Sequence, residues 1–300
     1  MLMNNTAAIR LRTLLGDYPV TRALKSGRVD SPMVALDYAD VKTPNHAFKR
    51  VVRDLEFDVA ELAIVTFLMA MAHEKPLTLL PVVVVSRYQH PYIVYNAERG
   101  PLTPAGLSGR RVGIRSYSVT TVTWIRGILA DDYGLNPDAV RWVTFEDPHV
   151  AEYRDPPNVE RAAKGQDCLE MLIKGELDAA VVPAIPDDPR LKTLIPDPAA
   201  AAREWRERNR ALQINHMVVV RKSLLQSGPQ AVKEVYRMLS ESKRAAGFPA
   251  LHGIDLNPFG IEANRRNLEV AVDYVYRQKM IPRRYGVDEI FDDVAHILEG

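Results

Sequence analysis

Residues 109–135, GRRVGIRSYSVTTVTWIRGILADDYGL, combine the signals of a strand, a polar turn and a helix. Val112-Gly113-Ile114 is typical of a short buried strand, and apolar residues then recur at helical spacing until Gly134, a C-terminal stop. The hydroxyl-rich turn lies between them. Because a helix start leaves N–H groups unpaired and carries partial positive charge, the turn suits a carboxylate or phosphate. The alternative is that its hydroxyls only cap their own helix.

Two pairs of segments, one member in each half of the chain, resemble each other. DYPVT at 17–21 matches SYSVT at 116–120, and LEFDVA at 55–60 matches GELDAA at 175–180. The first pair follows a strand and opens a helix, whereas the second ends a helix and begins a strand. Since ligands of open α/β sheets bind at the carboxyl ends of strands, the loops at 17–21 and 116–120 are candidate ligand loops.

The surrounding patterns extend each repeat into an alternation of strands and helices. Strands are expected at 33–39 and 141–145, and helices at 45–54 and 166–174. Each half then reads β, α, β, α, β, which is typical of a parallel sheet covered by helices. The sequence therefore predicts two duplicated α/β lobes.

Composition favours a small-molecule ligand. The chain has 300 residues, 47% of them apolar, enough for two cores, and a net charge of +1 that lacks the basic excess of nucleic-acid or membrane-surface binders. No signal-peptide or membrane-spanning pattern is evident, so we expect a cytoplasmic protein, with a homo-oligomer left open. Cys168 is the only cysteine, which excludes an internal disulfide, and it is expected to be a small packed residue on a helix.

The lobe boundaries follow from two apolar segments that we interpret as crossing, or hinge, strands, near 90–96 and 214–221. A charged run before the second, AAAAREWRERNR at 199–210, is expected to be exposed, and helices are expected at 227–246 and 261–278. Lobe I is therefore predicted to be discontinuous, with lobe II inserted into it. The predicted boundaries are 1–95 plus 215–300 for lobe I and 96–214 for lobe II.

Short segments spread over the chain carry a family resemblance, and they are 17–18, 21–24, 27–29, 56–61, 86–87, 90, 95–96, 111–114, 117, 120, 124–129, 133–134, 175–179, 216 and 218–221. With these segments the arrangement resembles the type 2 periplasmic binding protein fold, and more specifically the 4,5-dihydroxyphthalate decarboxylase family. The match is weaker over 183–213, where IPDDP at 185–189 replaces an expected aromatic and small polar residues.

The resemblance implies an α/β fold of two lobes, each a mixed, mainly parallel sheet flanked by helices, with a ligand cleft between them. It also implies a cofactor-independent carboxy-lyase that decarboxylates a hydroxylated aromatic, phthalate-like carboxylate. The alternative is a cytoplasmic solute-binding protein for a small aromatic or other carboxylate, since this fold hosts many binding proteins. Turnover, as opposed to binding alone, separates the two.

Arginines and histidines supply the candidate chemistry. Arg87 and Arg115 are candidate carboxylate clamps because a guanidinium matches a carboxylate with two bonds; the alternative is a salt bridge. His90 and His216 flank the predicted crossing strands and are candidate proton donors, the alternative being structural histidines. Glu61, expected at the end of the strand 57–60, is placed to orient a histidine or accept a phenolic proton, or else is a first-turn helix acid.

Hydroxyl-bearing side chains complete the predicted substrate-binding set. They are expected to bond to hydroxyls or carboxylates of the ligand, and they are Tyr18, Thr21, Thr66, Ser116, Tyr117 and Thr120. Trp124 falls on the apolar stripe of its helix and is expected in the core. The metal motifs and glycine-rich nucleotide loops that we sought are not found, so neither a metal nor another cofactor is predicted.

Overall fold

The computed structural model describes residues 8–247, 250, 251 and 253–299. The chain divides into two compact units. Unit 1 comprises Met1–Ser86, Ile214–Val272 and Ile281–Gly300, and unit 2 comprises Arg87–Gln213 and Asp273–Met280. The contacts thus group 273–280 with the inserted unit, whereas the sequence assigns it to lobe I.

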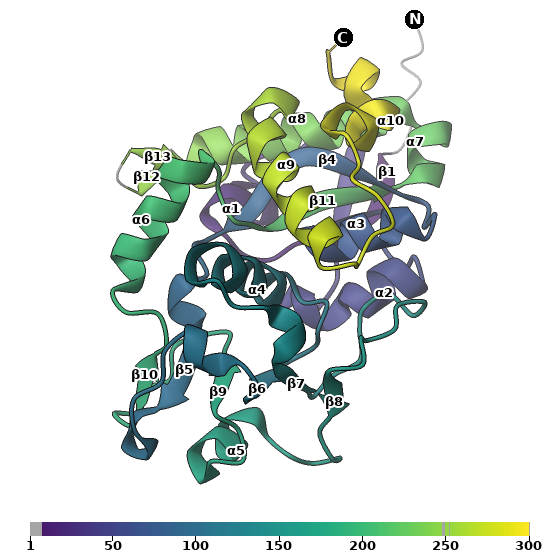
Figure 1. The fold of residues 1–300 in the computed structure, drawn as a ribbon. Helices are drawn as coiled ribbons and strands as arrows, with labels where there is room; N and C mark the ends of the chain where they lie inside the picture. The colour runs from purple at the N-terminus through teal and green to yellow at the C-terminus, as the bar shows by residue number, and fades with distance from the viewer. Residues whose placement is uncertain (1–7, 248–249, 252, 300) are drawn as a thin grey trace, which may run out of the picture. The chain divides into compact units, whose positions relative to one another are not determined.

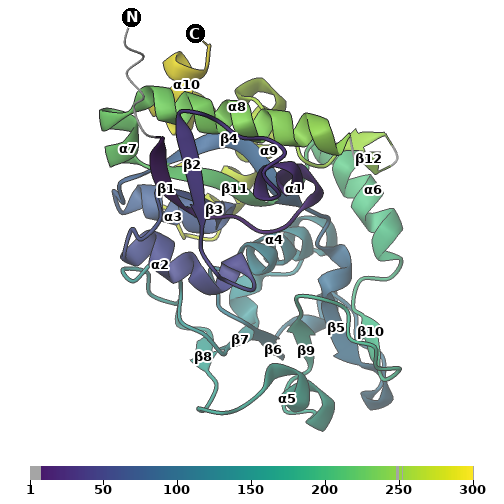
Figure 2. The ribbon, with the colours of Figure 1, turned by 180° about the vertical axis from the view of Figure 1, so that it is seen from behind.

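Unit 1 contains a five-stranded sheet of order β2-β1-β3-β11-β4. β1 pairs in parallel with β2 and β3, whereas β11 is antiparallel to both β3 and β4. The helices α1 and α8 pack against each other on one face (Figure 2), and α3 packs against the central strands from the other. The strands are β1 (Ile9–Leu14), β2 (Val34–Tyr38), β3 (Val59–Ala63), β4 (Leu77–Ser86) and β11 (Ile214–Arg221).

Several helices surround this sheet (Figure 1). They are α1 (Pro19–Lys25), α2 (Phe48–Arg53), α3 (Ile64–Ala72), α7 (Lys222–Ser227), α8 (Pro229–Ala246) and α10 (Val287–Glu299), with the first part of α9 (Ile261–Arg277). A 3₁₀ turn, η1 (Pro44–Ala47), precedes α2, and β12 (Ala250–Leu251) pairs with β13 (Ile254–Asp255).

Unit 2 contains a six-stranded sheet of order β10-β5-β9-β6-β7-β8. β6 is parallel to β7 and β9, and β7 is parallel to β8, whereas β5 is antiparallel to β9 and β10. The strands are β5 (Ile93–Asn96), β6 (Arg111–Ile114), β7 (Arg141–Thr144), β8 (Val159–Arg161), β9 (Ala179–Val181) and β10 (Leu191–Thr193). The helices are α4 (Thr120–Tyr133), α5 (Cys168–Lys174) and α6 (Pro198–Asn209), with 3₁₀ turns η2 (His90–Tyr92), η3 (Ala97–Arg99), η4 (Ala105–Leu107) and η5 (Pro137–Ala139).

The expected strand, turn and helix at 109–135 are confirmed as β6 and α4. Gly134 ends α4 in the left-handed region at a φ of 65°, a conformation that glycine adopts at little steric cost. The segment 90–96 forms η2 and then β5, and β5 is hydrogen-bonded on both sides within the unit 2 sheet. β11 is likewise a full member of the unit 1 sheet, since it pairs with β3 and β4.

The two aspartates of the repeat make equivalent contacts. In unit 1 the Asp58 carboxylate accepts from the backbone N–H of Arg12 at 2.8 Å, and the Asp58 N–H donates to the Arg12 carbonyl at 2.8 Å. In unit 2 Asp178 does the same with Arg111, at 2.9 and 2.8 Å. Each aspartate therefore fixes the start of a strand, β3 against β1 in unit 1 and β9 against β6 in unit 2, so the repeat has a structural basis.

Packing corrects one expectation and confirms two. The run 199–210 is not wholly exposed, because Trp205 on α6 is fully buried and its indole N–H donates to the Tyr274 hydroxyl at 3.0 Å. Trp124 is buried as expected. Cys168 packs against the apolar cluster beside α5, and burial raises the pKa of its thiol to about 12. Among the described helices, none is both long and apolar enough to span a membrane.

Replacing Asp178 tests the structural role of the repeat. We expect Asp178→Ala to lower the free energy of unfolding by about 1–3 kcal/mol, because the Arg111 N–H loses its charged acceptor. Asp138→Ala, which removes an exposed ion pair with Lys279, is the control and should cost less than about 0.5 kcal/mol. Urea denaturation measures both, and equal losses would contradict the assignment.

Candidate functional site

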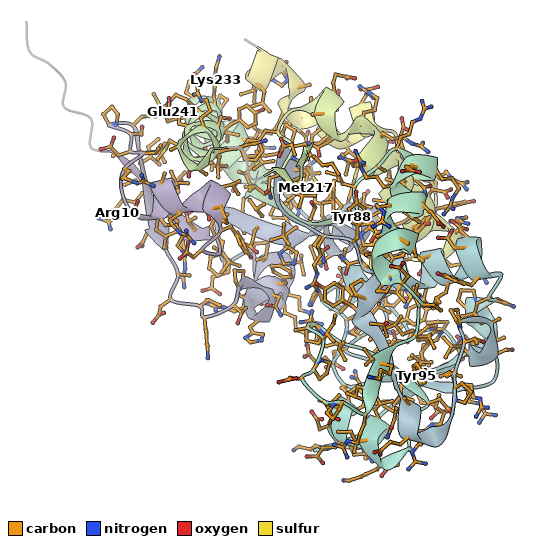
Figure 3. All side chains as sticks on the ribbon, turned by 90° about the vertical axis from the view of Figure 1, so that its left-hand side faces the viewer. Arg10, Tyr88, Tyr95, Met217, Lys233 and Glu241 are labelled. Carbon is orange, nitrogen blue, oxygen red and sulfur yellow. The ribbon has the colours of Figure 1, made fainter. Side chains whose placement is uncertain are left out.

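The register of two neighbouring strands brings Glu61 and His216 together in unit 1. In the antiparallel pair of β3 and β11, Glu61 lies opposite Val218, and Ala63 lies opposite His216. Alternate residues of a strand share a face, so Glu61 and His216 are diagonal neighbours on one face of the sheet. Met217, the next residue of β11 and labelled in Figure 3, faces the other side and is fully buried.

Glu61 is the centre of a buried hydrogen-bond network. Its side chain has an exposed fraction of 0% and contacts the Nδ1 atom of His216 at 3.0 Å. Its carboxylate also accepts from the backbone N–H of Gly16 at 2.6 Å and from the hydroxyl of Tyr18 at 2.8 Å. These three hydrogen-bond partners replace the hydrogen bonds to water that the carboxylate loses on burial.

The position of Glu61 corrects the sequence-based expectation. Glu61 lies in the middle of β3 rather than at its end, and α3 begins only after Ala63, so Glu61 is not a first-turn helix acid. The backbone around it is held by strands on both sides, because β3 pairs with β1 and β11. The carboxylate is therefore rigidly placed.

The Tyr18 ring lies directly against the backbone of Gly16, because a glycine has no side chain to occupy that space. A Cβ atom added at Gly16 would lie 2.5 Å from the Tyr18 ring, well inside contact distance. Thr21 completes this loop: its hydroxyl donates to the Gly16 carbonyl at 2.7 Å and accepts from the Tyr18 N–H at 2.9 Å. Burial and the adjacent Glu61 raise the pKa of Tyr18, so its hydroxyl keeps the proton that it donates.

His216 is held at one of its ring nitrogens. Its Nδ1 is engaged by Glu61, and the edge-to-face ring of Phe48 lies with its centroid 5.0 Å away. The side chain keeps an exposed fraction of 19%, so it is not sealed from solvent. A carboxylate that accepts a hydrogen bond from Nδ1–H fixes the tautomer and the orientation of the ring, and Nε2 is then the nitrogen that can exchange a proton.

His90, the second predicted proton donor, has a different environment in unit 2. It is fully buried in η2, its ring centroid lies 6.5 Å from that of Trp205, and neither ring nitrogen has a hydrogen-bond partner. Burial, with a smaller effect of Arg208, lowers the pKa of His90 to about 4. The imidazole is therefore neutral at neutral pH, which favours the structural interpretation over a proton donor.

The predicted carboxylate clamps also lie in unit 2. Arg87 stacks on the Tyr92 ring, 3.9 Å from its centroid, and donates from Nη1 to the Pro183 carbonyl at 3.0 Å. Arg115 lies 3.8 Å from the Glu146 carboxylate, a partly exposed ion pair. The fork of Arg87 is thus positioned by an aromatic ring, whereas that of Arg115 already faces a carboxylate.

The turn that precedes α4 is buried. Ser116, Tyr117 and Thr120 each have exposed fractions of 3% or less, and α4 is preceded by Val119 at its N-cap rather than by a hydroxyl residue. Thr66, the other predicted binding residue, is buried in α3 of unit 1.

Sequence reasoning assigned no role to Arg126, whose guanidinium carbon lies 3.6 Å from the centroid of the Tyr117 ring. One signal was available in the sequence: a charged residue falls within the apolar stretch 124–129 of its helix. In the described part of the chain, no group of three or more His, Cys, Asp or Glu residues could hold a metal ion.

Two curated proteins resemble the chain over most of its length. A 4,5-dihydroxyphthalate decarboxylase of Comamonas testosteroni is 29% identical over 251 residues, covering 79% of this chain and 76% of that protein. One of Pseudomonas putida is 29% identical over 210 residues, covering 66% of this chain and 81% of that protein.

The chain is a homologue of the 4,5-dihydroxyphthalate decarboxylases. The resemblance seen in the sequence is thereby confirmed. No protein-family model matches the chain.

Solved structures confirm the predicted fold class of this decarboxylase homologue, that of the type 2 periplasmic binding proteins. The periplasmic aliphatic sulphonate binding protein SsuA of Escherichia coli aligns with a TM-score of 0.59 at 13% identity, covering 96% of this chain and 98% of that one. The alkanesulfonate-binding SsuA of Xanthomonas axonopodis pv. citri gives 0.55 at 14%, covering 96% and 99%. The desulfurization enzyme DSZB gives 0.51 at 14%, covering 97% and 99%.

A methyl group at Gly16 tests the network around Glu61. We expect Gly16→Ala to lower the free energy of unfolding by about 1–3 kcal/mol, because the Tyr18 ring must leave the Glu61 carboxylate. Gly228→Ala is the matched control, since its added Cβ meets the nearest atom at 3.6 Å and should change stability by less than about 0.5 kcal/mol. Denaturation curves that do not separate the two variants would contradict this placement of Tyr18.

The acid sensitivity of folding tests the environment of His90. Because its pKa falls from 6.5 to about 4 on folding, the unfolded chain binds the proton more readily, and stability is lost as the pH drops through this window. At pH 5 the loss is roughly 2 kcal/mol, so His90→Leu should lose about that much less than wild type between pH 7 and pH 5. Urea unfolding at the two pH values measures this, and parallel losses would show that His90 is solvated.

Proposed function

We propose that this protein decarboxylates a hydroxylated aromatic, phthalate-like carboxylate without a cofactor. The homology to 4,5-dihydroxyphthalate decarboxylases supports the reaction class. The single structural observation that carries the proposal is the buried Glu61 carboxylate bonded to His216, since this pair supplies an oriented group able to donate a proton.

Loss of a carboxylate from an aromatic ring poses one chemical problem, the fate of the bonding electrons. A proton must be added to the ring carbon that carries the carboxylate, and a hydroxyl para to that carbon donates electron density as the carbon is protonated. The bond to the carboxylate then breaks, carbon dioxide leaves, and the bonding pair restores the aromatic ring. The net reaction consumes one proton, which the protein must deliver.

The residues of unit 1 divide this work. His216, protonated on both nitrogens, gives the Nε2 proton to the ring carbon and recovers a proton from water before the next turnover. Glu61 holds Nδ1 at 3.0 Å and so keeps the ring oriented while Nε2 gives up its proton. Tyr18 and Gly16 hold Glu61, so they act through it rather than on the substrate.

Carboxylate recognition is proposed for residues of unit 2. Arg87 is the better of the two predicted clamps, because stacking on Tyr92 orients its fork and the side chain donates to the Pro183 carbonyl rather than to a carboxylate. Arg115, Ser116, Tyr117 and Thr120 stay proposed binding residues, as does Thr66 in unit 1. The hydroxyl of Thr21 is engaged within its own loop, which favours a structural role.

Release of carbon dioxide from 4,5-dihydroxyphthalate by the purified protein tests the function. We expect His216→Ala and Glu61→Gln to reduce kcat by about 100-fold or more, because proton transfer by a positioned group contributes on that order. His46→Ala, at an exposed position in η1, is the control and should keep the wild-type rate. The kcat of His90→Leu, compared with that of His216→Ala, distinguishes the two histidines that the sequence named as candidate proton donors.

The outcomes separate enzyme from binding protein. No turnover of 4,5-dihydroxyphthalate or of a panel of hydroxylated benzoates and phthalates would contradict the proposal. Binding of these compounds without turnover would instead support the solute-binding alternative. The cytoplasmic location expected from the sequence stays a prediction, which cell fractionation checks.

A further inference from the structure

Arg126 is a fully buried cation in unit 2. Its exposed fraction is 0%, and its guanidinium donates from Nη1 to the Tyr117 carbonyl at 2.8 Å and from Nε to the Gln278 side chain at 2.6 Å. Nη2 lies 3.9 Å from the sulfur of Met280. These partners in the described chain are a carbonyl, an amide and a thioether, so none of them offsets the positive charge.

A buried charge without a counter-charge is expensive to maintain. Removing an ion from water costs several kcal/mol, and an arginine, unlike a lysine, does not escape this cost by losing its proton. Burial lowers the pKa of Arg126, with nearby Tyr117, Tyr153 and Asp155 opposing that shift. A side chain that only connected α4 to residues 278–280 would not need a charge, because an uncharged side chain also donates hydrogen bonds.

Two acidic groups, Tyr153 and Asp155, act on Arg126 through space without pairing with it directly. Burial raises the pKa of Asp155, and it raises the pKa of Tyr153 further above its usual range. In the described part of the chain, Oδ1 of Asp155 and the hydroxyl of Ser116 are both buried without a hydrogen-bond partner. Arg126 therefore has no directly paired counter-charge among the described residues.

The charge of Arg126 is coupled directly to Tyr117. The guanidinium carbon lies over the ring, 3.6 Å from its centroid, and the guanidinium also donates to the carbonyl of the same residue. The ring of Trp142 lies near both, with its centroid 5.7 Å from the guanidinium carbon and 6.5 Å, edge to face, from that of Tyr117. Both the backbone and the side chain of Tyr117 are thus fixed by one cation.

We propose that Arg126 is a positioning and specificity-determining residue: it fixes Tyr117 and gives the turn at 115–121 a permanent positive charge that selects a carboxylate over a neutral group. This inference rests on the proposed function, because it assigns the turn to an aromatic carboxylate ligand. Arg126 acts through the turn and its electrostatic potential, not by touching the substrate.

Binding of phthalate and of neutral phthalamide to the full chain, measured by calorimetry, tests the inference. Wild type should prefer phthalate, and Arg126→Met should reduce this preference by about tenfold or more, since a charge-assisted interaction is worth at least that factor. Gln278→Met is the matched control: it breaks a bond to Arg126 and one to the Thr123 carbonyl but leaves the charge. It should lower the melting temperature while retaining the preference.

The Arg126→Lys variant tests the role of the charge itself, because the pH dependence of its ligand affinity would not change if Arg126 were only structural. A buried lysine has a lowered pKa and loses its proton within the accessible pH range, whereas arginine stays charged. The ratio of the Kd for phthalate in Arg126→Lys to that in wild type should therefore rise between pH 6 and pH 9. A constant ratio, or an unchanged preference for phthalate in a folded Arg126→Met, would overturn the inference.

The same measurements separate this inference from the proposed function. If wild type binds phthalate but does not decarboxylate 4,5-dihydroxyphthalate, only the enzymatic proposal fails, and the Kd values still decide the role of Arg126. If wild type binds neither phthalate nor phthalamide, the inference fails together with the substrate class.

Discussion

The buried carboxylate of Glu61 is the constraint on which the arrangement of unit 1 depends. A carboxylate that has left water must be bonded on several sides, and here the donors come from the loop after β1 and from β11. Removing a donor leaves the buried carboxylate partly unsatisfied, at a cost of about 1–3 kcal/mol. The loop, the strand pair and the histidine are therefore fixed together, and the contacts that orient the His216 ring also stabilise the fold around it.

The two repeated halves solve the same structural problem but have diverged in their chemistry. Asp58 and Asp178 fasten corresponding strands with the same pair of backbone contacts. The loops that follow β1 and β6 differ, however. In unit 1 the tyrosine donates to a buried carboxylate, whereas in unit 2 Tyr117 packs against a buried guanidinium. One loop is thus coupled to negative charge and the other to positive charge, and the separate roles proposed for the two loops rest on this difference.

The environments of His90 and His216 differ although their sequence signals are similar. Both occur in segments rich in apolar residues, His90 just before β5 and His216 within β11. His216 meets a carboxylate and keeps partial exposure, whereas His90 is enclosed beside aromatic rings with a lowered pKa. Burial thus favours the neutral form of His90, whereas His216 has the carboxylate contact on which its proposed role in proton transfer rests.

The sequence by itself determined the α/β class, the positions of most strands and helices, the internal repeat and the family resemblance, because these depend on periodicity, turn residues and local order. Glu61, His216 and Tyr18 could be named as candidates for the same reason. Only the tertiary structure decided that they meet, since their contacts join residues 43 and 155 positions apart through strand register. Burial likewise lowers the pKa of His90 and leaves Arg126 as a buried cation without a directly paired counter-charge among the described residues. Both effects depend on neighbours that are remote in the chain, so the sequence alone did not reveal them.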